Sequence, residues 1–180
     1  YSALLARRLG LGADHCELIR IASPMHDIGK IGTPDHILLK PGGFGPEEFA
    51  IMTRHTEIGY QILAGSDSAL LQLAATIALT HHEKVDGSGY PKGLVGEAIP
   101  LEGRIVAIAD AFDALTTKRV YKPAFSVEQT TDIMRQQRST HFDAALLDLF
   151  LGKMDEVLLI KNRYADREGE SAAPGEAGPR

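Results

Sequence analysis

The chain has 180 residues, 44% of them hydrophobic, which is enough for one domain with a substantial core and argues against a fibrous or wholly disordered protein. The formal net charge of −5 argues against a general binder of nucleic-acid polymers, although a small anionic ligand needs only local positive charge. The single cysteine, Cys16, excludes an intramolecular disulfide and is typical of a reducing compartment. No apolar run is long enough to span a membrane, so the sequence predicts a cytoplasmic protein.

Helical periodicity dominates the chain, and no alternating apolar and polar run predicts a sheet, so we expect an all-α fold. Residues 1–9 are typical of the end of a helix that begins before this chain and is stopped by Gly10. A second helix should start near Asp14. Because Pro24 cannot donate to the carbonyl four residues back, it should bend or loosen that helix directly before His26.

A third helix is predicted to begin at Pro46. Its spacing turns Phe49, Met52 and Ile62 toward the core. His55, three residues after Met52, shares this inward face. In isolation, His55 is most simply interpreted as a core histidine.

The next helix repeats the pattern with Ala74 and Ile77, which places His81 at its inner C-terminal end. Residues 101–117 form a further, almost continuously apolar helix in which Asp110 is conspicuous. A buried carboxylate is costly unless it is paired or bound to metal. The argument for Asp110 therefore depends on its burial.

The C-terminal third is predicted from caps and composition. Ser126 and Gln129 form a capping box, and an apolar seam from Leu147 to Leu158 predicts one last helix. Residues 166–180 contain no large apolar side chain, so we expect a disordered tail.

Two adjacent histidines, His81 and His82, are rarely needed for packing, because a helix points neighbours about 100° apart. A metal cluster can use both. One His-Asp pair such as His26 and Asp27 would be weak evidence, since a capping Asp beside a histidine is common. Several compatible segments in one short chain favour a shared metal site. The candidate ligands are His26, Asp27, His55, His81, His82 and Asp110.

The stretch of residues 86–96 contains too many turn residues for a helix. The simplest interpretation is a surface connection. Its length and its Tyr90-Pro91 pair, close behind two candidate ligands, favour a functional loop instead.

In this order, the motifs resemble the HD-GYP family, a bacterial branch of the HD metal-dependent phosphohydrolases. The resemblance covers residues 1 to about 150. The motifs that carry it are His26-Asp27-Ile28-Gly29-Lys30-Ile31-Gly32, His81-His82-Glu83-Lys84, Asp86-Gly87-Ser88-Gly89-Tyr90-Pro91, Gly103-Arg104-Ile105-Val106-Ala107-Ile108-Ala109-Asp110 and His141-Phe142-Asp143.

The resemblance implies an HD-domain helical bundle with the HD-GYP loop over residues 1–165, its first helix cut short at the N-terminus. It also implies an enzyme that hydrolyses cyclic di-GMP, a bacterial second messenger, to linear pGpG or GMP. Its cofactors would be two or three divalent ions, iron or manganese, which suit imidazole and carboxylate ligands. The family usually carries a further His, and in trinuclear members a Glu, upstream of residues 1–6, so the number of ions stays open.

The resemblance makes Asp27 the carboxylate that bridges two cations. The ligands it assigns to the two positions are His26 and Asp110 for one, and His55, His81 and His82 for the other.

Asp27 and Lys30 are the predicted catalytic residues. Lys30 would stabilise charge on a phosphoryl oxygen. Arg119 and Lys122 match family positions that contact substrate phosphates, and without the family they would be solvated charges. Asp113, otherwise an ordinary surface acid, would orient a ligand or Lys30. Tyr90 would contact the substrate, or else stabilise its loop.

Three functions are weighed on this sequence. The first is hydrolysis of cyclic di-GMP, and the second is hydrolysis of another cyclic dinucleotide such as cyclic GMP-AMP. The third is a noncatalytic cyclic di-GMP receptor, or a module that docks a diguanylate cyclase (GGDEF) domain through Gly89-Tyr90-Pro91. The resemblance also implies an upstream sensory or receiver domain. Every family ligand that falls within the chain is present, which favours catalysis.

Overall fold

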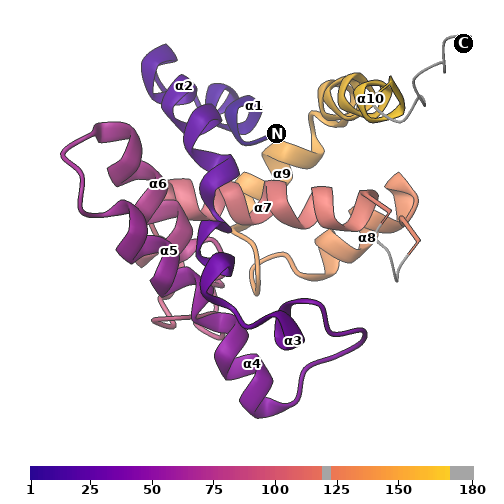
Figure 1. Ribbon diagram of the computed structural model, residues 1–180. Coiled ribbons are helices and arrows are strands. Elements are labelled where there is room, and N and C mark those ends of the chain that lie inside the picture. Colours follow the sequence, from indigo (N-terminus) through magenta and orange to yellow (C-terminus); the bar gives the residue numbers. More distant parts are fainter. Residues whose placement is uncertain (119–122, 171–180) are drawn as a thin grey trace, which may run out of the picture.

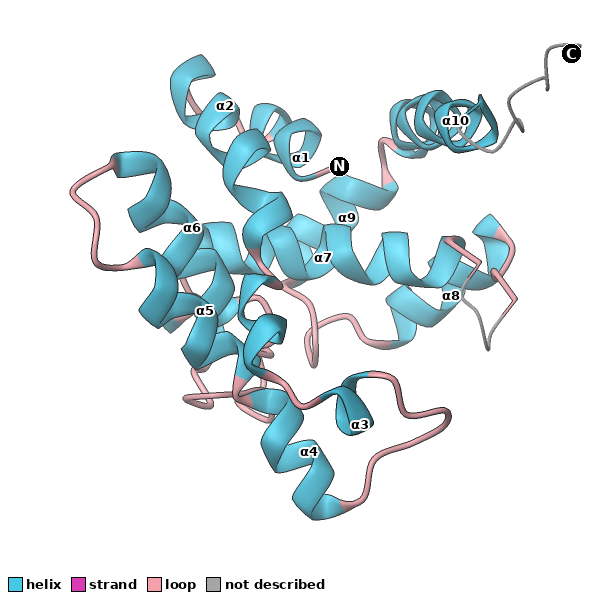
Figure 2. Ribbon diagram, in the orientation of Figure 1, coloured by secondary structure: helices cyan, strands magenta, loops and turns pink. Residues whose placement is uncertain are grey.

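The computed structural model describes residues 1–118 and 123–170, and within these ranges it contains helices and no strand (Figures 1 and 2). The expected all-α fold is confirmed. The elements are α1 (Ser2–Arg8), α2 (Ala13–Ala22), η1 (Ser23–Met25), η2 (Ile28–Gly32), α3 (Asp35–Leu38), α4 (Pro46–Thr53), α5 (His55–Leu63), α6 (Ala69–Thr80), η3 (Gly96–Ala98), α7 (Leu101–Thr116), α8 (Val127–Gln136), α9 (Ala144–Leu151) and α10 (Met154–Glu170), where η marks a 3-10 turn.

Helix α7 is the central element, and Figure 1 shows it crossing the middle of the molecule. Its residues Ile105, Ile108 and Phe112 are fully buried in one hydrophobic cluster with side chains of α1, α2, α8, α9 and α10. Val106, on another face, belongs to a second cluster built mainly from α6. Burying each such large side chain contributes about 1.5–3 kcal/mol, so both halves of the domain depend on α7. The almost continuously apolar sequence of this helix follows from burial on two faces.

The predicted bend before His26 is confirmed. Helix α2 ends at Ala22, and the next three residues, with Pro24 in the middle, form the 3-10 turn η1. The backbone N–H of His26 then donates to the carbonyl of Ser23 at 3.1 Å. The tighter winding of this turn changes the direction in which His26 and Asp27 leave the helix.

The expected third helix is wrong in one respect, because it is broken at Arg54 into α4 and α5. His55 is 1% exposed, as its inward position predicts, but Phe49 is 50% exposed and Ile62 is 51% exposed. The break shifts the helical phase, so one face cannot be extrapolated across it. In addition, α4 packs mainly with the short α3 in a lobe apart from α7 (Figure 1).

The C-terminal region also divides. The predicted capping box is confirmed, since Ser126 Oγ accepts from the backbone N–H of Gln129 and the Gln129 side chain accepts from the backbone N–H of Ser126. The single last helix is wrong: α9 ends before Gly152 and α10 begins two residues later. Helix α10 continues to Glu170, past the start of the expected disordered tail, and residues 171–180 lie outside the described residues.

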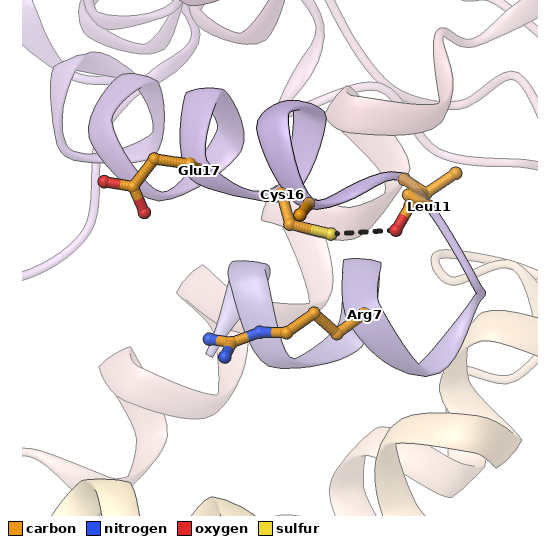
Figure 3. Close-up of a pocket in the computed structure, with 5 residues that line it drawn as sticks. Arg7, Leu11, Cys16 and Glu17 are labelled. Carbon is orange, nitrogen blue, oxygen red and sulfur yellow. Dashed lines mark hydrogen bonds between the residues drawn. The ribbon is translucent and has the colours of Figure 1, made fainter.

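Cys16 is buried between α1 and α2, where its thiol donates to the carbonyl of Leu11 at 3.4 Å (Figure 3). It borders a pocket of about 280 Å³ that Arg7 and Glu17 also line. This environment is typical of a small structural cysteine. Among the described helices, none combines the length and the apolar character needed to cross a membrane.

Gly29 allows the backbone of η2 to lie against α5. A Cβ atom at this position would lie 1.9 Å from the carbonyl oxygen of His55 and 2.4 Å from the backbone nitrogen of Gly59. Both obstacles are backbone atoms, which cannot rotate away. The close approach brings the chain segment that follows Asp27 directly against the helix that begins with His55.

We therefore predict that Gly29→Ala lowers the free energy of unfolding by about 3 kcal/mol, at the upper end of overpacking costs, because η2 and α5 must separate. Chemical denaturation measures the change. Gly43→Ala is the matched control, since a Cβ there meets no atom within 4 Å. Equal stability of the two variants would contradict the role given to Gly29.

Candidate metal centre

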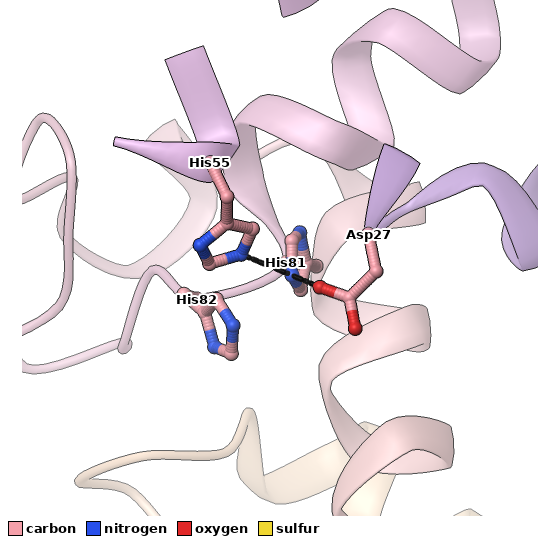
Figure 4. Close-up of side chains that lie close together, drawn as sticks. All are labelled: Asp27, His55, His81 and His82. Carbon is pink, nitrogen blue, oxygen red and sulfur yellow. Dashed lines mark hydrogen bonds and ion pairs between the residues drawn. The ribbon is translucent and has the colours of Figure 1, made fainter. Parts of the chain in front are cut away.

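The carboxylate of Asp27 lies at the centre of a group of histidines (Figure 4). Its Oδ1 atom is 3.4 Å from Nε2 of His55 and 3.7 Å from Nε2 of His81. With His82, these residues offer ligand atoms that all lie within 4.8 Å of one another. They come from three separate elements, since Asp27 precedes η2, His55 begins α5, and the two adjacent histidines follow α6.

The other oxygen of Asp27 faces a different set of groups. Its Oδ2 atom is 3.3 Å from Nε2 of His26 and accepts a hydrogen bond from the ammonium of Lys30. Nε2 of His26 is in turn 3.7 Å from Oδ1 of Asp110, on α7. The two oxygens of Asp27 therefore point toward two distinct donor groups. All six predicted ligands are brought together around them.

Three of the four imidazoles are held by backbone carbonyls. The pairs are His26 Nδ1 with Ser23 O at 2.8 Å, His55 Nδ1 with Met52 O at 2.7 Å, and His81 Nδ1 with Ala78 O at 3.0 Å. Because a carbonyl only accepts, each Nδ1 donates, and Nε2 of the neutral ring keeps its lone pair. This arrangement orients each Nε2 toward Asp27, as is typical of histidines that bind metal.

Asp27 Oδ1 is buried and has no hydrogen-bond partner among the described residues. It faces Nε2 of His55 and His81, which in the neutral rings are also acceptors. Electron-rich atoms collected in this way are costly unless a cation lies between them. The donor set therefore fits a divalent metal ion.

The surroundings of the centre keep Asp27 ionised and His82 neutral at neutral pH, and these are the states in which they can bind a metal ion. Burial alone would raise the pKa of Asp27, but His26 and Lys30 hold it far below its usual range, so the carboxylate stays ionised. Burial lowers the pKa of His82 to about 2. At His26 burial alone would lower the pKa, but Asp27 and Asp110 raise it above its ordinary value. The position beside His26 thus favours a cation.

Asp110 is only half-buried. Its side chain is 32% exposed, because this end of the centre opens onto a pocket of about 450 Å³ that Tyr1, His26 and Asp113 also line. Periodicity alone could not show the pocket. Asp110 qualifies as a candidate ligand through its distance to His26 and not through burial.

The predicted loop of residues 86–96 lies beside the adjacent histidines His81 and His82. The Tyr90 ring is tilted over His82, with 4.8 Å between the ring centroids, and Phe49 of α4 contacts it edge-on at 5.8 Å. Burial raises the pKa of the Tyr90 hydroxyl, which keeps the phenol neutral. Tyr90 therefore forms one wall of the centre.

The HD domain family matches residues 1–146 of this chain. The chain belongs to the HD domain family. Its Gly89-Tyr90-Pro91 loop and its similarity to cyclic di-GMP phosphodiesterases assign it to the HD-GYP branch.

Several relatives of this HD domain are curated proteins. It is 45% identical over 174 residues to the cyclic di-GMP phosphodiesterase response regulator RpfG of Xanthomonas campestris, covering 97% of this chain and 45% of that protein. It is 42% identical over 182 residues to a cyclic di-GMP phosphodiesterase of Thermotoga maritima, covering 97% and 50%. It is 46% identical over 166 residues to the 3'3'-cGAMP-specific phosphodiesterase 2 of Vibrio cholerae, covering 92% and 32%. The chain thus spans half or less of these relatives.

A solved structure shares the fold. The cyclic GMP-AMP specific phosphodiesterase V-cGAP3 of Vibrio cholerae matches this HD domain with a TM-score of 0.66. The match covers 86% of this chain and 42% of that chain at 16% sequence identity. A likeness at this identity establishes the helical architecture only.

The sequence predicts three further site residues outside the group of ligands. Arg119 and Lys122 lie outside the described residues. Asp113 is on the exposed side of α7 and lines the same pocket as Asp110. Their roles toward substrate or ligands stay predictions.

The sequence-based list of site residues missed Glu83 and gave His141 no role. The Glu83 side chain is buried and accepts hydrogen bonds from backbone amides of the 86–96 loop. The ring of His141 donates to the side chain of Gln137, and burial lowers its pKa to about 4. Both residues stand in motifs that carry the family resemblance, so their position there was the available signal.

We expect manganese to stabilise the HD domain through this cluster, because only the folded chain assembles the ligands. At a free metal concentration 100 times the Kd, the free energy of unfolding should rise by about 2.7 kcal/mol. The increment, followed by thermal or chemical unfolding, should largely vanish in His81→Ala. It should persist in His36→Ala, which removes an exposed histidine of α3. The same increment in both variants would exclude His81 as a ligand.

Proposed function

We propose that this chain is the catalytic domain of a metal-dependent phosphodiesterase that hydrolyses cyclic di-GMP to pGpG or GMP. The observation that carries the proposal is the division of the two Asp27 oxygens between separate donor groups. Such an arrangement suits two cations that act together on one phosphodiester. The printed names of close relatives supply the substrate, since several are cyclic di-GMP phosphodiesterases.

The ligand assignment follows the two sides of Asp27. On the Oδ1 side the proposed ligands are His55, His81 and His82, and on the Oδ2 side they are His26 and Asp110. Iron or manganese suits this mixture of imidazole and carboxylate, and the described residues include no cysteine in the cluster. A third ion would need ligands from beyond this set.

Bound divalent ions would supply the central chemistry, since a catalytic metal lowers the pKa of its water and a metal pair can stabilise both the attacking and the leaving oxygen. The protein's own contribution begins with Asp27, whose lowered pKa keeps it ionised. Lys30 adds a fixed positive charge beside Asp27 Oδ2. There it can stabilise negative charge that develops on a phosphoryl oxygen. Tyr90 shields His82 from water on the loop side.

Substrate recognition would add charges outside the metal centre. Arg119 and Lys122 are proposed to contact the phosphates of the substrate, on the strength of the family resemblance. Asp113 is proposed to orient a ligand or Lys30 from the pocket wall, and its place beside Asp110 supports this. Tyr90 is proposed to contact the substrate as well, since its ring lies at the centre.

Hydrolysis of cyclic GMP-AMP is the second candidate. It is favoured by the 46% identity to a phosphodiesterase named as specific for 3'3'-cGAMP. The same metal centre would serve both substrates, so the choice depends on how the nucleobases are recognised. A noncatalytic receptor, or a module that docks a GGDEF domain through Gly89-Tyr90-Pro91, has less support because every family ligand that falls within this chain is present. A cytoplasmic location and an upstream sensory or receiver domain remain parts of the proposal.

The first test is turnover. The protein loaded with iron or manganese should convert cyclic di-GMP to linear product, identified by chromatography, and should act less efficiently on 3'3'-cGAMP. Asp27→Ala should abolish turnover and remove most of the metal, because both proposed metal positions lose the carboxylate that they share. His36→Ala should retain activity. Robust hydrolysis by Asp27→Ala or by metal-free protein would contradict the proposed mechanism. Faster turnover of 3'3'-cGAMP than of cyclic di-GMP would favour the second candidate function.

The second test concerns Lys30. Lys30→Ala should lower kcat for cyclic di-GMP about 10²-fold with near-normal metal content, since it removes charge stabilisation in the transition state and no ligand. Lys40→Ala is the control, because Lys40 is also ion-paired and similarly exposed but pairs with Glu48. Unchanged kcat in Lys30→Ala would reduce Lys30 to a structural partner of Asp27.

A further inference from the structure

Glu83 is a buried acid that no cation neutralises among the described residues. Its side chain is almost completely covered, at 2% exposure of the residue. One carboxylate oxygen accepts from the backbone N–H of Lys92 at 2.8 Å, and the other accepts from that of Leu94 at 2.9 Å. Glu83 therefore ties down the far half of the 86–96 loop.

The near half of the loop folds back onto the same stretch of backbone. A Cβ at Gly89 would lie 2.3 Å from the backbone nitrogen of Lys84 and 2.6 Å from Cα of Glu83, so only glycine fits there. The next residue, Tyr90, donates its backbone N–H to the carbonyl of His82 at 3.2 Å. The loop is thus packed directly over the chain segment that carries two candidate ligands.

The base of the loop is anchored independently of Glu83. The backbone N–H groups of Val85 and Asp86 donate to the carbonyls of His141 and Thr140, and the N–H of Gly96 donates to the carbonyl of Val85. These bonds would persist if the Glu83 carboxylate were changed. Altering Glu83 should therefore release the middle of the loop and leave its ends in place.

His82 is the candidate ligand that depends on this loop. His26, His55 and His81 each have Nδ1 bound to a backbone carbonyl. Within residues 1–118 and 123–170 the ring of His82 has no such bond, and it packs against the rings of His81 at 4.1 Å, Tyr90 at 4.8 Å and His55 at 5.1 Å. His55 and His81 are themselves held by backbone carbonyls, whereas Tyr90 is the ring that the loop contributes. Phe49 supports Tyr90 from the other side. Ring packing, with Tyr90 as its loop component, takes the place of the hydrogen bond that orients the other imidazoles.

We propose that Glu83 is a positioning residue for the metal centre. Its buried carboxylate holds the loop at Lys92 and Leu94, the loop holds Tyr90, and Tyr90 fixes the orientation of the His82 ring. The inference rests on the proposed role of His82 as a metal ligand. It gives a function to the conspicuous acid that follows the two histidines.

The test compares Glu83→Gln with Glu97→Gln, an exposed acid at the edge of the same loop. The glutamine amide nitrogen cannot accept, so one loop amide loses its partner. In metal-free Glu83→Gln, hydrogen exchange should accelerate in peptides that cover residues 86–96 and stay unchanged in α7. Manganese affinity should fall about 10- to 100-fold, as for other residues that orient metal ligands. Glu97→Gln should match the unmodified protein in both measurements.

A double-mutant cycle separates positioning from general stability. Because Glu83 is proposed to act through Tyr90, Glu83→Gln should weaken manganese binding far less in a Tyr90→Ala background than in the unmodified protein. Gly89→Ala provides a second route, since it should lift the loop while leaving the Glu83 carboxylate intact. It should weaken manganese binding similarly, which keeps the test open if Glu83→Gln does not fold.

The proposal is overturned if the loop exchanges no faster in Glu83→Gln, if manganese affinity is unchanged despite faster exchange, or if the two substitutions are additive. None of these measurements uses cyclic di-GMP. Lack of turnover by the unmodified protein would therefore refute the proposed function while leaving the exchange and affinity results to decide the role of Glu83.

Discussion

The carboxylate of Asp27 is the group on which the other features of the centre depend, because it faces a different set of donors with each oxygen. A partly buried carboxylate would destabilise the domain by itself when one of its oxygens, like Oδ1 here, has no hydrogen-bond partner among the described residues. His26 and Lys30 offset part of that cost on the exposed side, where a cation is already favoured. On the buried side the imidazoles of His55 and His81 present lone pairs and not protons. The fold has thus assembled a site whose electrostatics are completed by added positive charge.

Backbone geometry makes this arrangement possible. The 3-10 turn at Pro24 redirects the chain before His26, and the absence of a side chain at Gly29 lets the following turn lie against α5. Buried His55 is then fixed by the carbonyl of Met52 near the end of α4, and buried His81 by that of Ala78 in α6. The remaining imidazole, on His82, lies between the end of α6 and the loop. Its ring is held by side-chain packing and not by a hydrogen bond to a backbone carbonyl of the described residues. Hydrogen bonds to the backbone therefore hold His55 and His81, whereas His82 depends on the loop.

Much of this could be predicted from sequence, because apolar spacing, proline and adjacent histidines act locally. The all-α fold, the bend at Pro24 and the inward position of His55 are of this kind. The exposure of Phe49 and Asp110 was missed because it depends on a helix break and a pocket that arise from tertiary packing. Glu83 was missed for another reason. Its partners are backbone amides nine and eleven residues away, and a pattern of side chains does not predict which backbone amides a carboxylate will bind.

The most direct measurement of the central claim is the electron paramagnetic resonance spectrum of the protein saturated with manganese. Two ions that share the Asp27 carboxylate must lie close enough to be magnetically coupled. The account predicts a coupled spectrum at full loading of the unmodified protein, and Asp27→Ala should lose this coupled signal together with most of the bound manganese. A spectrum of isolated manganese alone at full loading of the unmodified protein would contradict it.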